Sequence, residues 1–481
     1  METKDLIAST LLLIATCGGV VAATLSYYAR AALFVALVVG AVFVDKMGVE
    51  FMSLYWYRGT TRGLELTLLD AIAFSVLAGS LLAPRHPYPR LFWPAGVGLM
   101  ALFWVYCFFQ VLASTPMLTG MFELLKMARG MLVVAAAAAF VRTQRELAVL
   151  AFALAGTLGI EGLVAFKQRY YNIMDRAHGT IEHANSLSMY ICMVTPVVLA
   201  AALSDFPRWL RWWCGAGVVA GAVGVLLTAS RAGIPIFLAV VGGMALWGVS
   251  FRITWQKIAI GAASVAFFGV LVYGSWDTLY TRYTQATLQS EYFDQRTEGR
   301  GVYLRWAGEI MHDHPHGVGL NNWSYYVSRE YGPRHGYRYE DYRDFSSAPQ
   351  AGESPGFYAA PAHNLFALTA GEVGIGGAII FALLWLRWFQ LGAMFLWRKL
   401  EDPMHRMGAG VFFGTAGIFL QSMTEWTYRQ TALFFTFSVL LGVLASLTWG
   451  RRNLAPTQAA AAVRVRDEEY VLGPTAGAER W

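Results

Sequence analysis

The sequence is poor in charge and in cysteine. Only 14% of its 481 residues are charged and 56% are hydrophobic, whereas about 25% of residues are charged in an ordinary soluble domain. This deficit extends along most of the chain, so it excludes a soluble globular protein and predicts a membrane protein with many spans. All four cysteines lie in apolar runs, and we expect buried thiols rather than disulfides or metal ligands: Cys17, Cys107, Cys192 and Cys214.

In place of charged residues and cysteines, the chain contains long apolar runs. They lack the alternation of a β-barrel, and a backbone in lipid must satisfy its own polar groups, so an all-α fold with about 12 transmembrane helices (12–13) is expected. The run at 364–397 exceeds one straight crossing, which predicts a tilt or a projection from the bilayer. The candidate spans are 6–27, 30–45, 64–83, 92–114, 118–141, 146–166, 185–203, 210–228, 232–250, 256–275, 364–397, 407–424 and 430–449.

Basic residues give the expected orientation. They flank the spans in alternate short loops, which the positive-inside rule places in the cytoplasm: Arg85 with Arg90, Arg142 with Arg145, Arg208 with Arg211, Arg252 with Lys257, Arg398 with Lys399, and Arg451 with Arg452. Thirteen spans would put the charged N-terminus outside, so we expect twelve. The net charge of +6 needs no nucleic-acid partner. The N-terminal run is expected to be retained.

Four regions follow from this pattern. Residues 1–275 and 364–450 are expected to be transmembrane helices, residues 276–363 one long polar periplasmic loop, and residues 451–481 a disordered cytoplasmic tail. Three polar clusters then converge on the outer face: the 167–185 connection, Thr228-Ala229-Ser230-Arg231, and the long loop. The loop contributes Arg296, Arg300, Arg305, His316 and, at its end, His363-Asn364.

Arg231 and His363 are the candidates for chemistry. Arg231 lies between two apolar runs without a nearby acid, so it either extends to lipid headgroups or clamps a diphosphate, whose oxygens match a guanidinium. His363 precedes a span, where it serves as a helix cap or as a base that removes a proton from a hydroxyl group. A base with arginines is a sufficient set without a metal or a cofactor.

Other polar groups have plainer interpretations. In His312-Asp313-His314-Pro315-His316 the proline interrupts any shared face, and Tyr303, Trp306 and Ile310 predict a helix just before it, so a metal site is disfavoured. Asp341 and Asp344 are read as a solvated face, and Gly317-Val318-Gly319 as a turn. Lys126 and Arg129 fall within a span, and either snorkel or pair, with Glu161 as a possible partner.

Four blocks resemble the O-antigen ligase and O-antigen polymerase superfamily. Gly179-Thr180-Ile181-Glu182-His183-Ala184-Asn185 resembles a Gly-Thr-x-x-His-x-Asn block, and Ser230-Arg231-Ala232-Gly233 a Ser-Arg-Gly/Ala block. Residues 313–322, Asp-His-Pro-His-Gly-Val-Gly-Leu-Asn-Asn, resemble a Pro-x-Gly-x-Gly block. His363-Asn364-Leu365 followed by Gly371-Glu372-Val373-Gly374-Ile375-Gly376 resembles a His-Asn-Leu, Glu-x-Gly-x-x-Gly block.

The resemblance implies residue roles. His363 matches the catalytic base and Arg231 a diphosphate-binding arginine. Arg300 is the match for a second arginine, although Leu304 stands where the family has tryptophan, so Arg305 stays an alternative. Arg176 is expected near the lipid phosphate. His183, Asn185, Asn364 and Glu372 complete the set as supporting residues, and no metal is implied.

The resemblance also implies the activity. It is inverting transfer of a glycan from undecaprenyl diphosphate to a hydroxyl acceptor at the periplasmic face of the bacterial inner membrane. The expected acceptor is lipid A-core, as in an O-antigen ligase. The alternatives are an O-antigen or exopolysaccharide polymerase, then a protein O-oligosaccharyltransferase, then a non-enzymatic transporter of the lipid-linked glycan. Other than the donor and the acceptor, only membrane lipids are expected as partners.

Overall fold

The described part of the chain is almost entirely helical. The computed structural model describes residues 3–44, 48–54, 57–83, 93–181, 183–248, 255, 266, 268–270, 272–285, 300–337, 339, 359–397 and 402–453. The long helices are α1 (Thr3–Leu25), α2 (Tyr27–Gly40), α3 (Leu68–Leu82), α4 (Val97–Leu112), α5 (Met117–Phe140), α6 (Gln144–Tyr170), α7 (Ala184–Ala202), α8 (Arg208–Leu227), α9 (Gly233–Gly248), α16 (Leu365–Ala393), α17 (Pro403–Ser422) and α18 (Thr431–Asn453).

These helices confirm an all-α membrane fold. Within the described residues, α1, α6, α7, α8, α16 and α18 are long and apolar enough to cross a membrane, and α2, α3, α4 and α9 are shorter apolar helices. Each predicted span coincides with a described helix except 256–275, most of which lies outside the described residues. About twelve crossings therefore stay a prediction. The tail 454–481 and the basic residues at 85, 90, 252, 257, 398 and 399 also lie outside the described part.

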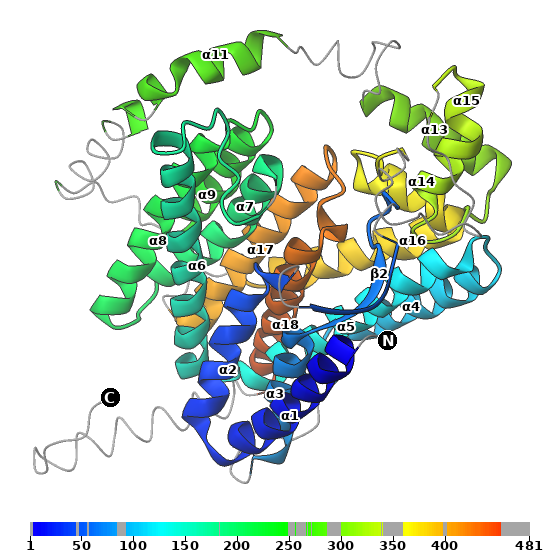
Figure 1. Ribbon diagram of the computed structural model, residues 1–481. Coiled ribbons are helices and arrows are strands. Elements are labelled where there is room, and N and C mark those ends of the chain that lie inside the picture. Colours follow the sequence, from blue (N-terminus) through cyan, green and yellow to red (C-terminus); the bar gives the residue numbers. More distant parts are fainter. Residues whose placement is uncertain are drawn as a thin grey trace, which may run out of the picture.

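Helices α17 and α18 lie in the middle of the body (Figure 1). Figure 1 shows α6 to α9 on one side, α4, α5 and α16 on the other, and α17 with α18 between them. Helix α17 approaches α7 closely because glycines recur on its facing side, where a Cβ at Gly410 would lie 2.9 Å from Val197 Cα and one at Gly417 would lie 2.7 Å from the Cys192 carbonyl oxygen. Small residues at this spacing let membrane helices pack backbone to backbone.

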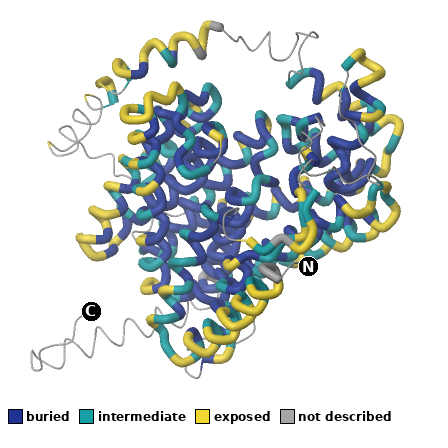
Figure 2. The backbone as a smooth tube through the Cα atoms, viewed as in Figure 1, coloured by how far each residue is buried: buried dark blue, intermediate teal, exposed yellow. Residues whose placement is uncertain are grey.

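The periphery differs from the centre, as Figure 2 shows. Cys107, Cys192 and Cys214 are buried, but Cys17 is exposed, so the expectation of four buried thiols was wrong for that residue. It lies on α1, where only 6% of the apolar window is buried. A helix at the rim of a membrane protein presents its apolar side chains to lipid rather than to a protein core.

A two-stranded hairpin precedes α3 and was not expected. Strands β1 (Gly48–Ser53) and β2 (Gly63–Thr67) pair antiparallel, so the predicted span at 64–83 becomes helical only at Leu68. The helix begins there because the Asp70 carboxylate accepts hydrogen bonds from the Thr67 backbone N–H, at 2.7 Å, and from its hydroxyl, at 2.9 Å. This pair is a capping box.

The charged residues of α5 are paired inside the body, but not with Glu161. Lys126 lies 3.5 Å from Glu123, and Arg129 lies 2.8 Å from Asp70. Glu161 instead accepts a hydrogen bond from the Thr180 backbone N–H at 2.9 Å. The predicted partner was wrong because Glu161 on α6 binds the loop in front of α7, whereas the acids that pair with α5 come from its own preceding turn and from α3.

Helix α16 is interrupted at Gly374, and a loop fits into the interruption. Gly374 has φ 68°, in the left-handed region that favours glycine. The Ile375 N–H donates to the Pro315 carbonyl at 3.0 Å, and the N–H groups of Val318 and Gly319 donate to the carbonyls of Gly371 and Glu372 at 3.1 and 2.9 Å. The Pro-x-Gly-x-Gly loop and the Glu-x-Gly-x-x-Gly helix are therefore two halves of one interlocked joint.

This joint leads to a first prediction. In the Gly374→Ala variant the new Cβ would lie 2.6 Å from the Gly317 nitrogen at a strained φ, so we expect unfolding to become easier by about 1–3 kcal/mol. Thermal unfolding of the purified protein in detergent measures this. Gly159→Ala on α6 is the matched control, because nothing lies within 4 Å of its added Cβ. Equal unfolding temperatures for the two variants would contradict the interlock.

Candidate active site

His363 stands directly in front of α16 but does not cap it. The cap is Asn364, whose Oδ1 accepts from the N–H groups of Phe366 and Ala367, both at 3.0 Å. Its Nδ2 donates to the Met423 carbonyl at 2.9 Å, which joins the start of α16 to the turn after α17. The plain interpretation of His363 as a capping residue is therefore excluded, and its side chain is 38% exposed.

Glu425 is the partner of His363. Its Oε2 lies 2.6 Å from the His363 Nδ1. It is located in the short turn between α17 and the 3-10 helix η3 (Thr427–Arg429), and its side chain is only 7% exposed. Sequence reasoning did not find this residue. The available signal was an acid in a turn between two spans on the same side as His363.

Glu425 is held ionised by its neighbours. Burial alone would raise the pKa of its carboxyl group, but the hydrogen bond and charge of His363, followed by Arg300 and Asn185, outweigh burial and lower that pKa. An ionised carboxylate only accepts hydrogen bonds, so the His363 Nδ1 must be the donor. The lone pair of a neutral imidazole is then on Nε2, the nitrogen that faces away from Glu425.

Arg231 is fixed by the block around it. The Ser230 Oγ accepts from the Gly233 N–H at 3.2 Å and so caps α9. Gly233 lets α9 approach α7, since a Cβ there would lie 2.9 Å from the Ser188 Cβ. Ala229 adopts φ 47°, which turns the chain sharply after α8. The Arg231 side chain therefore projects from a rigid junction of α8 and α9.

The long loop contributes Arg300 rather than Arg305 to this place. Both lie on α13 (Arg300–Asp313), and the predicted stripe of Tyr303, Trp306 and Ile310 is buried on that helix. The Arg300 Nη2 lies 3.4 Å from the Glu425 Oε1, whereas Arg305 is exposed on another face of α13.

A chain of hydrogen bonds brings in the loop before α7. The Arg176 Nη2 donates to the Asn185 Oδ1 at 2.6 Å, and the Asn185 Nδ2 donates to the Glu425 Oε1 at 2.9 Å. The Arg176 Nε also donates to the Thr228 carbonyl at 3.0 Å. Four predicted residues thus meet Glu425 directly or through one neighbour. His183 is exposed and is not among the residues that line the cleft.

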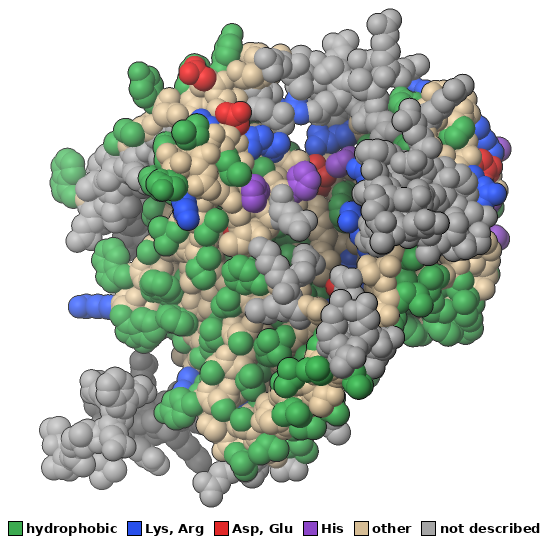
Figure 3. Space-filling model, in the orientation of Figure 1, with side chains coloured by type: hydrophobic (Ala, Val, Ile, Leu, Met, Phe, Trp, Pro, Cys, Tyr) green, Lys and Arg blue, Asp and Glu red, His purple; other side chains and the backbone are tan. Residues whose placement is uncertain are grey.

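A small cleft lies between these groups. It is lined by residues of α7, α13, the α8–α9 junction and the turn after α17: Asn185, Met189, Ser230, Arg231, Ala232, Arg300, Gln421, Thr424 and Glu425. Figure 3 shows histidine and charged side chains gathered around a hollow in the upper part of the molecule, above mostly apolar flanks. The cleft holds about 30 Å³, roughly the space of one water molecule.

The remaining candidates lie elsewhere. Glu372 is not in the cleft but is buried deeper in the body, where its carboxylate accepts hydrogen bonds from Arg429 and, at 3.2 Å, from the Trp323 N–H. Within the described ranges, no three His, Cys, Asp or Glu side chains are grouped to hold a metal ion. His312 in the histidine-rich segment is instead exposed beside Asp313, at 3.1 Å. Asp341 and Asp344 lie outside the described residues.

A comparison with known protein families gave a match in the middle part of the chain. Residues 216–382 match the family described as O-antigen ligase. The match contains Arg231, Arg300 and His363, and it ends before Glu425. A comparison with curated proteins gave no match.

Proposed function

Because residues 216–382 match the family described as O-antigen ligase, we propose that the protein moves a glycan from undecaprenyl diphosphate to a hydroxyl acceptor, with lipid A-core as the acceptor. The cleft faces the periplasm of the inner membrane in this proposal. The observation that carries it is that Arg231, Arg300 and His363, which come from separate parts of the sequence, lie around one buried carboxylate, that of Glu425.

The proposed reaction is one displacement at the anomeric carbon. The His363 Nε2 takes the proton from the acceptor hydroxyl, whose oxygen forms the new glycosidic bond. The bond from the anomeric carbon to the diphosphate oxygen breaks, and its electron pair leaves with undecaprenyl diphosphate. Attack opposite the leaving group inverts the configuration. Glu425 stabilises the imidazolium that forms, as a carboxylate does in a catalytic triad, and no step calls on a metal.

The charge of the cleft suits this leaving group. Arg231 and Arg300 line the cleft together with Glu425, and Arg176 is joined to Glu425 through Asn185, so three guanidinium groups lie in or next to the cleft. A diphosphate diester carries two negative charges. Guanidinium groups bind phosphate oxygens in pairs and do not lose their proton, so they stabilise the charge that develops on the leaving oxygen.

Arginine variants test the proposal. Arg231→Gln and Arg300→Gln are each expected to weaken binding of a fluorescent undecaprenyl-diphosphate oligosaccharide about 10- to 100-fold, because a charged hydrogen-bond donor is lost. Arg305→Gln is the control, one turn further along α13 and exposed, and should bind like the wild type. If Arg300→Gln and Arg305→Gln bind equally, the assignment of the second arginine is wrong.

Glu425→Gln tests the partner of the histidine. A glutamine of similar shape can donate to the His363 Nδ1, which puts the proton on Nε2 and removes the base. We expect turnover to fall by up to about 10⁴-fold, the loss for such a change in a triad, with donor binding retained. Recovery of much of the rate in Glu425→Asp would support the orienting role. Wild-type turnover in Glu425→Gln would contradict it.

The same carboxylate gives a pH dependence of stability. Its pKa in the folded state is lower than the ordinary value of about 4.3, so the ionised group stabilises the fold above that pH and loses this effect as pH falls through the folded-state pKa. The unfolding temperature of the wild type should therefore approach that of Glu425→Gln as the pH falls below about 4.3.

Separate acceptors distinguish the related activities. Purified protein with the lipid-linked donor in EDTA should transfer to lipid A-core, and not to a second lipid-linked repeat or to a serine-containing peptide. Transfer only to the second repeat would make it a polymerase, and transfer only to the peptide a protein glycosyltransferase. Flipping of the donor that survives the loss of both Arg231 and His363 would favour a transporter.

A further inference from the structure

A second described cavity lies at the opposite end of α16 from His363. It measures about 500 Å³ and is lined by the segment that leads into α4, by α16 and by the end of α18: Trp93, Pro94, Ala95, Gly96, Gly98, Leu99, Arg387, Thr448 and Trp449. His363 precedes residue 365 of α16, whereas Arg387 lies near its end at Ala393. The cavity is thus separate from the candidate active site.

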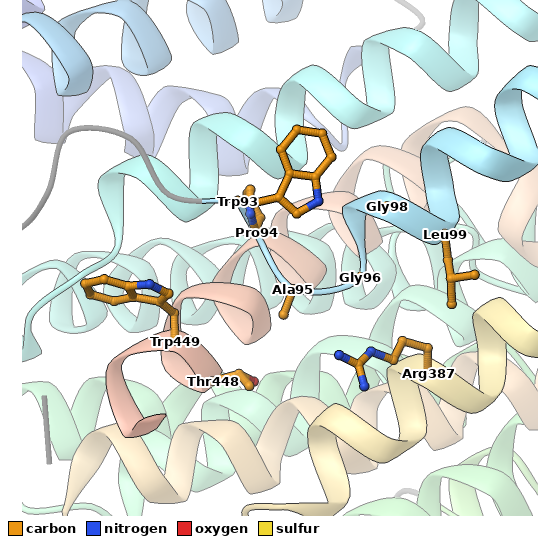
Figure 4. Close-up of a pocket in the computed structure, with 9 residues that line it drawn as sticks. All are labelled: Trp93, Pro94, Ala95, Gly96, Gly98, Leu99, Arg387, Thr448 and Trp449. Carbon is orange, nitrogen blue, oxygen red and sulfur yellow. The ribbon is translucent and has the colours of Figure 1, made fainter. Parts of the chain in front are cut away.

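The charged side chain among the described residues that line this cavity is a cation, Arg387. In Figure 4 the Arg387 guanidinium extends from α16 toward the space between the 94–96 segment and Thr448, and its Nη1 donates to the Gln390 Oε1 at 2.6 Å, which leaves its other N–H groups for a ligand. The described lining includes no acid. Helix α4 begins at Val97 without a capping side chain. The Val97 N–H donates to the Pro94 carbonyl at 3.2 Å, and the next N–H groups of the first turn have no partner inside the helix. A guanidinium and a helix N-terminus on one cavity together favour a phosphate group.

The walls beside the cavity are apolar and open. Leu102 lies one turn from Leu99 on α4 and is 50% exposed, and Leu383 lies one turn from Arg387 on α16 and is 47% exposed. The two helices pack together, as the hydrogen bond from the Tyr106 hydroxyl to the Val373 carbonyl at 3.0 Å shows. The acyl chain of a lipid whose phosphate lies in the cavity can therefore extend along these apolar faces. A free phosphate ion would leave the same faces uncovered.

Two tryptophans mark the depth of the cavity in the bilayer. Trp93 is 72% exposed, and Trp449 lines the cavity near the end of α18. Indole rings gather at the level of the lipid headgroups, and basic pockets between membrane helices at that level bind anionic headgroups. We propose that this cavity binds one anionic phospholipid, with its phosphate on Arg387 and the α4 N-terminus and its chains along α4 and α16.

Native mass spectrometry of the full chain, released from detergent with added lipid, tests the site. We expect one dioleoylphosphatidylglycerol to be retained about tenfold more tightly than dioleoylphosphatidylethanolamine, and Arg387→Gln to remove that preference. Arg208→Gln is the matched control, an exposed arginine at the start of α8, and should keep it. An unchanged preference in Arg387→Gln would overturn the proposal.

Two further arms separate the possible explanations. Inorganic phosphate should not compete with phosphatidylglycerol, and equal protection by phosphate would mean an ion site rather than a lipid site. Leu99→Trp fills the cavity without changing its charge, so it should reduce lipid retention even if Arg387→Gln proves too unstable to purify. Full retention in Leu99→Trp would show that the lipid binds elsewhere.

Discussion

Glycan transfer by a His363→Ala variant is expected to fall about 10²–10⁴-fold, the share of the rate that a positioned base supplies. Donor binding should persist, because the proposed diphosphate contacts come from Arg231 and Arg300 and not from the imidazole. The measurement is single-turnover transfer from undecaprenyl-diphosphate glycan to lipid A-core, with donor affinity determined in parallel on the same preparation.

The structure offers a sharp control for this experiment. His312→Ala removes an imidazole from an exposed place at the end of α13, where it contacts only Asp313 among described side chains, so it should transfer at the wild-type rate. Normal transfer by His363→Ala would remove the proposed base. Loss of donor binding along with transfer would mean that the residue holds the site together instead of moving a proton.

The largest expected effect on stability is at Arg429, which lies deeper in the body than the candidate active site. Its guanidinium pairs with Glu372, with Glu123 at 3.2 Å, and with the Thr60 hydroxyl at 2.9 Å. Lys126 donates to the Arg429 carbonyl at 2.5 Å and completes the network. All of these charges are buried, and removing one partner of a buried pair costs about 3–5 kcal/mol because the other charge is left without compensation.

We therefore expect Arg429→Met to lower the free energy of unfolding by about 3–5 kcal/mol. The double variant Arg429→Met, Glu372→Gln should regain part of the loss, since one orphaned acid is neutralised. Arg334→Met is the control, because Arg334 is 46% exposed and pairs with Glu330 and Asp313 near the surface, where such pairs contribute about 0–1 kcal/mol. Equal losses in Arg429→Met and Arg334→Met would refute the buried network.

This network also bears on the candidate active site. Two pairs join the same two segments: His363 with Glu425 near the surface, and Glu372 with Arg429 below it. The start of α16 and the turn after α17 are thus fastened at two depths. Glu372, predicted as a supporting residue, holds this arrangement from beneath the cleft and does not line it.

Much of this arrangement follows from local sequence. Apolar runs identify the helices because a span must be long and apolar, and the stripe of Tyr303, Trp306 and Ile310 identifies α13 because burial follows helical spacing. The meeting of Arg231 with His363 was predicted from the side of the membrane on which each apolar run ends. These inferences depend only on residues close together in the sequence or on the side of the membrane at which a residue lies.

The missed features depend on contacts between distant segments. Glu425 has no spacing relation to His363, and only the packing of α17 against α16 brings them together. Arg129 pairs with Glu65 of β2 and Asp70 of α3. Lys126 pairs with Glu123 of its own helix and donates to the Arg429 carbonyl. The apolar pattern does not show how these elements pack together. The break at Gly374 accommodates the loop at 315–319. Neither glycine-rich block shows by itself that it packs against the other, so the sequence does not predict the break.

The interruption of α16 also divides its 29 residues unequally. The part after Gly374, residues 375–393, measures about 28 Å at 1.5 Å per residue, close to the roughly 30 Å hydrocarbon thickness of a bilayer. The shorter part, which begins next to His363, is then surplus to one crossing, and this favours the predicted projection of the run 364–397 from the bilayer into the headgroup level. A lipid-borne substrate could present its phosphates there while its long hydrocarbon tail stays dissolved in the membrane.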